Sequence, residues 1–409
     1  MLEGRICGLR IPKAFFSNRF RVARMGVSVL SVVLRGTRGV GGRKIVKLQL
    51  LSLLFATAEI CYNSEMNRRD FLSAMALAMP GLAFAGATET GCAGKPLKVC
   101  VFSDLHYEPG CFVNDTPAFL EKILARAEAA RCDMVIHVGD LMHNVKSAKG
   151  KEFLKIYNDF RIPTYGCLGN HDQDATFYKE TCEAYRMPDG HYSFDRGGFR
   201  FVVLDPNYTL NPGIGAVHHE NHNYAKLVKG ARINYIPEPQ LEWLRDRVVG
   251  SPLPCVVLSH QSLERPESGR GVINADAVRA IFAEANARKP GTVRLAMNGH
   301  MHTDNLRILD NILYWEVNSA NYHWYNQTHT AYPADFVRTH GLSQNVIGWK
   351  EPLSAILTLS PDGGIRIEGS KSDFLFGVTP EKAGLDPYDV NGRRVTAEIQ
   401  SANLRFSYC

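Results

Sequence analysis

Five short apolar stretches in the chain have the length and composition of buried strands, and each is closely followed by Asp, Asn or His. Between the stretches, apolar residues recur with helical spacing, so strands and helices alternate and indicate α/β layers. Ligand sites in open α/β sheets gather at the carboxyl ends of strands, so we expect the five polar ends to meet. These ends are Asp104-Leu105-His106, Gly139-Asp140, Gly169-Asn170-His171-Asp172, His260 and Gly299-His300-Met301-His302.

The same spacing predicts the individual elements. A helix is expected from Ala175, with Asp174 as its N-cap. The polar segment 206–236 shows little periodicity and is long for a structureless connection, so we interpret it as a functional loop or a mobile segment. Strands are predicted at 98–102, 134–138, 163–168, 192–194, 199–204, 255–258, 293–297, 305–309, 312–317, 354–359 and 364–368. Further helices are predicted at 116–130, 147–160, 238–249 and 275–287.

The polar ends carry ligand groups at spacings that suit metal ions. Residues two apart in an extended segment point the same way, so Asp104 and His106 can share one ion, and so can His300 and His302. A glycine before Asp140 and before His300 lets the backbone turn sharply. Seven converging groups exceed the needs of one tetrahedral ion and fit two ions that share a carboxylate. Imidazole together with carboxylate favours Zn, Fe or Mn over Ca.

Taken singly, each motif has an ordinary structural explanation. An isolated Asp-x-His is common, the segment from Gly169 to Asp172 alone would be a turn, and His260 alone would be a core histidine. The order of the five motifs, each after a strand-like stretch, is what indicates a shared site.

The ordered set of motifs resembles that of the calcineurin-like metallophosphoesterase superfamily, over about residues 98–320. The resemblance implies a metallo-dependent phosphatase fold, an α/β four-layer sandwich of two mixed β-sheets flanked by helices. It also implies that Asp140 bridges two metal ions and that His171 is the catalytic residue that faces the leaving group. The other ligands that it implies are Asp104, His106 and His302 for the first ion, and Asn170, His260 and His300 for the second.

One of these ligands has to be chosen among several histidines, because the superfamily places a lone histidine between its Asn-His and Gly-His-x-His motifs. Only His260 directly ends an apolar strand, so we predict that it is the ligand. The remaining candidates are His191 and three histidines of segment 206–236, for which contact with solvent or substrate is expected: His218, His219 and His222.

The resemblance leads us to expect an exported binuclear-metal phosphoesterase that hydrolyses phosphomono- or phosphodiesters by attack of a metal-bound hydroxide. Its cofactors would be two divalent or trivalent ions of Mn, Fe or Zn. Purple acid phosphatases resemble this motif order but carry a tyrosine where this chain has His143, so a violet ferric enzyme is disfavoured. The candidate substrate contacts are His143, His323 and Trp324, and Asp172 indicates diesters weakly.

Other functions remain open: a catalytically silent metal-binding or scaffold module on the same fold, and a cyclic-nucleotide phosphodiesterase in particular. The complete ligand set and His171 argue against the silent module. A nuclease ranks last. The net charge of +6 comes from residues 1–65, which hold eleven Lys/Arg and three Glu, so the remainder carries −2. Long polyanions gain from basic surfaces, so we expect a small phosphate ester and no nucleic acid as partner.

A second start is visible inside the chain. Residues 66–85 read MNRRDFLSAMALAMPGLAFA, which resembles a twin-arginine export signal. We therefore interpret 1–65 as a spurious N-terminal extension, and we expect the export machinery as a partner and a periplasmic or extracellular location. The phosphoesterase domain is expected at 95–375, followed by a C-terminal tail at 376–409. No apolar stretch is long enough for a transmembrane anchor.

Overall fold

Two six-stranded mixed sheets and their covering helices form most of the part of the chain that the structure, a computed structural model, describes. The described residues are 94–222, 224, 227–265 and 269–408. The predicted extension 1–65 and export signal 66–85 lie outside them. Among the described residues, no helix combines the length and the apolar character that crossing a membrane requires.

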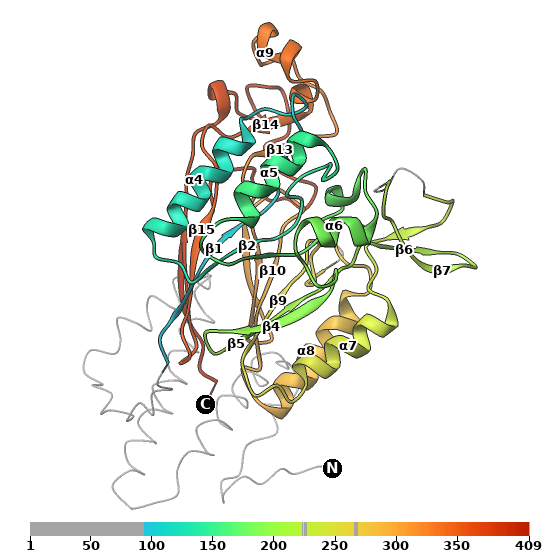
Figure 1. Cartoon of the computed structure of the whole chain (residues 1–409), viewed down its shortest axis with the longest axis vertical. Helices are drawn as coiled ribbons and strands as arrows, with labels where there is room; N and C mark the ends of the chain where they lie inside the picture. Colours follow the sequence, from blue (N-terminus) through green and yellow to red (C-terminus); the bar gives the residue numbers. More distant parts are fainter. Residues whose placement is uncertain (1–93, 223, 225–226, 266–268, 409) are drawn as a thin grey trace, which may run out of the picture. The chain divides into compact units, whose positions relative to one another are not determined.

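The first sheet has the strand order β17-β16-β15-β1-β2-β3. Strands β1, β2 and β3 run parallel, and β15, β16 and β17 add antiparallel neighbours on the other side of β1. Helices α4 and α5 cover its outer face (Figure 1). The elements are β1 (Leu97–Phe102), α4 (Thr116–Ala129), β2 (Met134–His137), α5 (Ala148–Asn158), β3 (Thr164–Gly166), β15 (Ala355–Leu359), β16 (Gly364–Gly369) and β17 (Ala402–Arg405).

The second sheet has the order β11-β12-β10-β9-β5-β4, in which β5, β9, β10 and β12 run parallel. Helices α7 and α8 lie together over its outer face (Figure 1). The elements are β4 (Tyr192–Arg196), β5 (Phe199–Val203), α7 (Glu238–Val248), β9 (Cys255–Leu258), α8 (Ala275–Arg288), β10 (Val293–Asn298), β11 (Asn305–Leu309) and β12 (Ile312–Glu316).

Alternation of side chains along the strands produces the layers. In β9, Val256 and Leu258 pack in the core that also contains the first sheet, whereas Val257 packs in a second core with Leu244 of α7 and Phe282 of α8. Successive residues of a strand point to opposite faces, so a strand that is apolar throughout can be buried on both sides. The predicted α/β sandwich of two mixed sheets flanked by helices is therefore confirmed.

The structure corrects two local predictions. The helix predicted from Ala175 begins only at Tyr178, and Phe177 rather than Asp174 is its N-cap residue, because the Asp174 carboxylate is bonded to two histidines. Segment 206–236 is not structureless, because its described residues contain a small sheet of order β7-β6-β8. In addition, residues Tyr322–Trp324 pair with a later strand. The elements are η2 (His171–Gln173), α6 (Tyr178–Ala184), β6 (Tyr208–Asn211), β7 (Gly215–His218), β8 (Arg232–Ile233), β13 (Tyr322–Trp324), α9 (Ala334–Thr339), η4 (Ser343–Asn345), β14 (Val346–Gly348) and η5 (Leu375–Gly377).

The C-terminal segment contributes to the sandwich. Within 376–408, strand β17 pairs with β16 at the edge of the first sheet. Arg126 joins helix α4 to this part of the first sheet. Its guanidinium donates to the Ser354 carbonyl at 2.6 Å and to the Glu368 carbonyl at 2.7 Å. One side chain thus joins a covering helix to the carbonyls that flank the β15–β16 hairpin.

We predict that Arg126→Met lowers the free energy of unfolding by about 1–3 kcal/mol, because charge-assisted bonds to carbonyl groups are lost. Urea unfolding measures the change, and metal content should stay unchanged because Arg126 is remote from the predicted ligands. Arg161→Met is the matched control, since that arginine is 73% exposed and its pair with Glu128 lies at the surface. Equal stability of the Arg126 variant and the control would contradict the prediction.

Candidate metal centre

The polar ends of the strands meet at one edge of both sheets, as predicted. In the first sheet, Phe102 at the end of β1 is level with His137 of β2, which is level with Gly166 of β3. In the second sheet, the parallel strands β9 and β10 also end side by side, because Leu258 is paired with Met297. The two edges are joined directly, because the backbone N–H of His300 donates to Asp104 Oδ2 at 3.1 Å.

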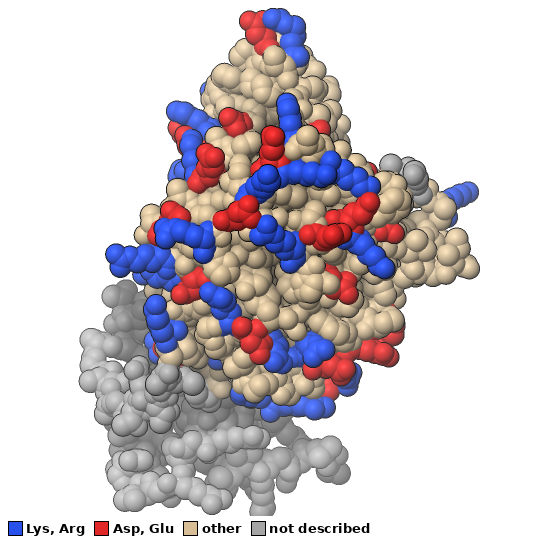
Figure 2. Space-filling view, viewed as in Figure 1, with Lys and Arg blue, Asp and Glu red and all other residues tan. Residues whose placement is uncertain are grey.

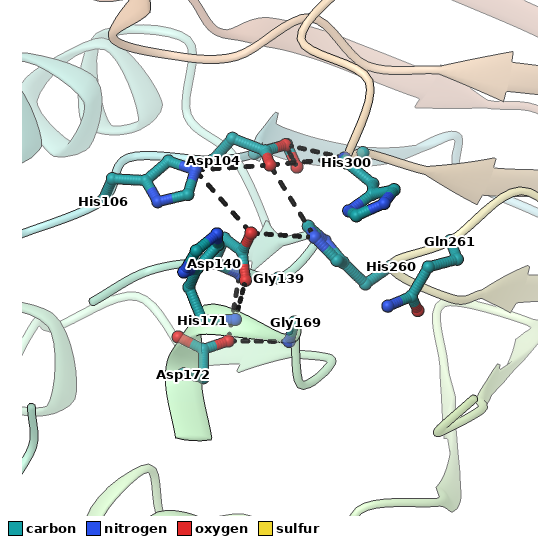
Figure 3. Close-up of polar contacts among 12 residues, drawn as sticks. Asp104, His106, Gly139, Asp140, Gly169, His171, Asp172, His260, Gln261 and His300 are labelled. Carbon is teal, nitrogen blue, oxygen red and sulfur yellow. Dashed lines mark hydrogen bonds and ion pairs between the residues drawn. The ribbon is translucent and has the colours of Figure 1, made fainter. Parts of the chain in front are cut away.

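The predicted ligands form two groups whose ligand atoms lie within 4.8 Å of one another, and all of them are buried except His300, which is half-buried: Asp104, His106 and His302, and Asp140, His260 and His300. Figure 3 shows how most of them face a common centre. In the first group, His302 Nε2 lies 3.1 Å from Asp104 Oδ1. In the second, His260 Nε2 lies 3.0 Å from Asp140 Oδ2. Asn170 is also buried, and its Oδ1 has no hydrogen-bond partner among the described residues.

The backbone at these positions is unusual. Five of the predicted ligands have a positive φ, between 51° and 71°, in the left-handed region that non-glycine residues seldom adopt. The extended geometry on which the two-residue spacing argument rested is therefore wrong. Asp104 and His106 still converge in the first group, but His300 and His302 belong to different groups and do not share one ion as the spacing predicted. Left-handed backbone at a cluster of polar residues is typical of functional sites, where the surrounding fold maintains the strain. The residues are Asp104, His106, Asp140, His300 and His302.

Two glycines permit the close approach of these loops. A Cβ on Gly169 would collide with the Asp140 side chain and backbone, and a Cβ on Gly299 would collide with Ser103 and Asp104. Neither glycine has a positive φ, so contact distance, not backbone conformation, requires a residue without a side chain.

The tautomers of the histidines fit metal ligation. Nδ1 of His260 lies 2.7 Å from the Val138 carbonyl, and Nδ1 of His302 lies 2.7 Å from the Tyr322 carbonyl. A carbonyl only accepts, so each Nδ1 carries the hydrogen and the Nε2 of a neutral ring presents a lone pair. These Nε2 atoms face carboxylate oxygens, an arrangement that a metal ion stabilises and that a proton on Nε2 can also stabilise. The donor set, imidazole and carboxylate with one amide oxygen, therefore suits metal ions such as Zn, Fe or Mn.

Burial and mutual charge decide the protonation of the ligands. Burial alone would raise the pKa of Asp104 and Asp140, but neighbouring histidines hold both pKa values below their usual range. Burial also opposes a charge on His260, yet Asp140 and Asp104 raise its pKa to about 10. Burial lowers the pKa of His106 to about 3. In the absence of an ion, a proton on His260 therefore balances the two carboxylates.

Asp172 organises the loops of the centre. It is fully buried, and five protein donors reach its two oxygens. The bonds fasten the loop after β2 to the loop after β3, so the diester preference that Asp172 indicated weakly gains no support from a substrate contact. The donors are the N–H groups of Gly169 (2.7 Å), Asp140 (2.9 Å), Leu141 (2.9 Å) and Met142 (3.1 Å), and the hydroxyl of Tyr185 (2.5 Å).

His171, the predicted catalytic residue, lies on the open side of the centre and is 34% exposed, whereas Asp104 and His260 are fully buried. Its N–H donates to Asp140 Oδ1 at 2.8 Å, which fixes the backbone beside the predicted bridging carboxylate. Although burial opposes it, the carboxylates of Asp140 and Asp174 raise the pKa of His171 to about 9. Nδ1 of His171 lies 2.8 Å from Asp174 Oδ2.

The three predicted substrate contacts lie near the ligands but are engaged by the protein. His143 has both ring nitrogens within hydrogen-bond distance of protein groups, Nε2 of His106 Nδ1 at 2.9 Å and Nδ1 of Asp174 Oδ2 at 2.7 Å. His323 is buried, with Nδ1 2.9 Å from the His302 carbonyl, and burial lowers its pKa to about 4. Trp324 is half-buried and packs edge-on against the ring of a phenylalanine.

Sequence reasoning missed residues of the polar segment and beyond that surround the centre. The Tyr224 hydroxyl donates to Asn234 Oδ1 at 2.6 Å, and Asn234 Nδ2 donates to the Arg270 carbonyl at 2.8 Å. The pKa of His300 is lowered by burial first, by the charge of His260 second, and also by the charge of Arg270. The guanidinium of Arg270 therefore lies near the second group. No motif marks these residues, and only the folded chain brings them together.

Comparison with known families decides the identity of this site. The model of the calcineurin-like phosphoesterase family matches residues 97–304, which is more than half of the chain. The chain belongs to the calcineurin-like phosphoesterase family. It is a metal-dependent phosphoester hydrolase, as predicted, and the matched range contains every predicted ligand.

Solved structures give a weaker likeness to the phosphoesterase. A dimetal phosphatase from Danio rerio is similar with 13% identity and a TM-score of 0.49, over 76% of this chain and 100% of the other. A purple acid phosphatase from yellow lupin (Lupinus luteus) seeds is similar with 14% identity and a TM-score of 0.41, over 77% of this chain and 55% of the other. No curated protein matches the phosphoesterase by sequence.

We predict that Gly169→Ala removes bound metal from the phosphoesterase, because the new methyl group displaces the Asp140 carboxylate. Metal per chain, measured by elemental analysis after removal of loosely bound ions, should fall while circular dichroism stays native. Gly341→Ala is the matched control, since a Cβ there meets open space and its φ is not positive. Normal metal content in the Gly169 variant would contradict the prediction, because it would show that the loop moves enough to accommodate the methyl group.

We also predict that metal binding releases a proton from His260 at neutral pH. The raised pKa of about 10 means that the metal-free protein holds this proton, which a metal ion has to displace. Metal affinity should therefore fall as the pH falls. Calorimetry in two buffers of different ionisation enthalpy measures the released protons. An observed heat that is independent of the buffer would contradict the prediction.

Proposed function

We propose that the protein is an exported phosphoesterase that hydrolyses small phosphomono- or phosphodiesters with two ions of Mn, Fe or Zn. The observation that carries the proposal is the position of Asp140 between the two groups of ligands. Its Oδ2 lies 3.7 Å from His106 Nε2 of the first group and 3.0 Å from His260 Nε2 of the second. A carboxylate in this position can bridge two ions, which is the arrangement found in two-metal phosphatases.

The residues divide the work of the reaction. Bound ions would supply an activated water and offset negative charge on the phosphate. The buried ligands, set on short loops at the ends of strands, would hold the ions against rigid sheets. His171 stands at the exposed side, its ring oriented by Asp174, and we assign to it proton donation to the leaving oxygen. The positive charge of Arg270 near His300 would favour an anionic substrate.

Two observations bear on the class of substrate. On the face shown in Figure 2, acidic and basic side chains are interspersed, which favours a small ester over a long polyanion. Asp172 bonds to backbone, so it does not favour a cyclic-nucleotide or other diester over a monoester. We therefore keep both ester classes in the proposal.

Export is part of the proposal because of the sequence of residues 66–85, with its Arg68-Arg69 pair and the small-x-small site Ala83-Phe84-Ala85. A start at Met66 would place the protein in the periplasm or outside the cell after removal of the signal. Expression from Met66 with and without an Arg68→Lys, Arg69→Lys change tests this directly. Loss of export in the changed form is expected, and equal export would overturn the twin-arginine assignment.

The function is tested by hydrolysis of p-nitrophenyl phosphate and bis-p-nitrophenyl phosphate, with added Mn²⁺ and with chelator. Release that depends on metal is expected for one ester or for both, and the preference assigns the class. No release from either substrate by metal-loaded protein would favour a silent metal-binding or scaffold module.

We predict that His171→Ala lowers turnover of an alkyl phosphate by about 10²–10⁴-fold, because the poor leaving group loses its proton donor. The loss should be smaller for p-nitrophenyl phosphate, whose leaving group needs less protonation, and metal content should be retained. Steady-state kinetics on both esters measures the difference. Turnover equal to that of the unchanged protein would remove this role from His171.

A further inference from the structure

A carboxylate outside the predicted ligand set connects the metal centre to the predicted proton donor. Asp174 Oδ2 lies 2.7 Å from His143 Nδ1 and 2.8 Å from His171 Nδ1. His143 Nε2 in turn lies 2.9 Å from Nδ1 of the predicted ligand His106. One oxygen atom therefore joins two histidines, and one of these reaches the first group of ligands.

The geometry determines which nitrogen carries each hydrogen. An ionised carboxylate can only accept, so Nδ1 of His143 and Nδ1 of His171 both donate to Asp174. A neutral His143 then has its lone pair on Nε2, which accepts from the Nδ1–H of His106. His106 is left with a lone pair on Nε2, the atom that lies 3.1 Å from His302 Nε2 and faces the first group.

The same three residues do not need a third ion. Distances of 2.7 and 2.8 Å between nitrogen and oxygen are those of charge-assisted hydrogen bonds. Nε2 of His143 is engaged by His106 as well, so both nitrogens of His143 have protein partners. The cluster of His143, His171 and Asp174 is therefore a hydrogen-bonded unit that supports the centre beside it.

We propose that Asp174 is a positioning residue with two arms. Through His143 it sets the tautomer of His106 and directs Nε2 of that ligand toward the first metal ion. Directly, it orients His171, so that a proton given to the leaving oxygen comes from Nε2. This role for His143 differs from the substrate contact predicted from the sequence. The His171 arm rests on the proposed function, whereas the His143 arm concerns metal binding alone.

The two arms can be separated with His143→Phe, which interrupts only the arm to His106, and Asp174→Asn, which weakens both. Removal of a partner that orients a ligand typically costs 10–100-fold in metal affinity. We expect each variant to lose Zn²⁺ affinity of this size for one of two ions, measured by competition with a chelator. The double variant should lose no more than His143→Phe alone, because Asp174 acts on His106 through His143.

Kinetics on metal-saturated protein test the second arm. Asp174→Asn should lower turnover of an alkyl phosphate more than that of p-nitrophenyl phosphate, as we expect for His171→Ala, whereas His143→Phe should leave the ratio of the two turnover rates unchanged. A merely structural role would move neither the ratio nor the affinity of a single ion. If the protein hydrolyses no phosphate ester, the proposed function fails, and the affinity measurements still decide the His143 arm.

Asp335→Asn is the matched control, because Asp335 is 86% exposed on α9. Circular dichroism and thermal unfolding in chelator establish that each variant is folded. Nitrogen-15 spectra of histidine-labelled, metal-free protein add a readout of the tautomer: His106 should carry its hydrogen on Nδ1, and lose this preference in His143→Phe. Normal Zn²⁺ affinity in His143→Phe, or additive losses in the double variant, would overturn the proposal.

Discussion

The whole site depends on two carboxylates, Asp104 and Asp140, that are buried where two sheets meet. Burying one negative charge is costly, and burying two close together is possible only if positive charge is supplied locally. Without an ion, protonation of His260 supplies part of it, as the raised pKa of that histidine indicates. Metal ions supply it better, so the burial of these two carboxylates and the chemistry of the phosphoesterase depend on the same positive charge.

The surrounding structure makes this concentration of charge tolerable. Backbone carbonyls hold Nδ1 of His260 and His302, and backbone N–H groups hold the carboxylate of Asp172. The bonds to His260 and Asp172 come from loops at the ends of parallel strands, whereas the bond to His302 comes from Tyr322 in β13. The ligands therefore meet the ions already oriented, with little left to reorganise on binding.

The layers of the fold could be predicted from the sequence because strands such as β9 are apolar throughout. Each such strand is followed by polar residues and is separated from the next strand by a segment with helical periodicity. Sequence reasoning also brought together the predicted ligands, because each lies within a few residues of a strand end. It failed where long-range contacts decide. Asp174 has the residue type of an N-cap. Its hydrogen bond to His143 depends on the folded position of that histidine, which the sequence does not reveal. Strands β6, β7 and β8 are only two to four residues long and almost entirely half-buried or exposed, so they offer too little apolar periodicity to mark them.

The contributions of both sheets to one site have a consequence for the molecule as a whole. Asp104 and Asp140 follow strands of the first sheet, whereas His260 and His300 follow strands of the second. An ion held by residues of both sheets would cross-link the sandwich, and unfolding would have to release it. Because a ligand that binds only the native state adds stability in proportion to the logarithm of its free concentration, the melting temperature of this chain would report the metal supply of its surroundings.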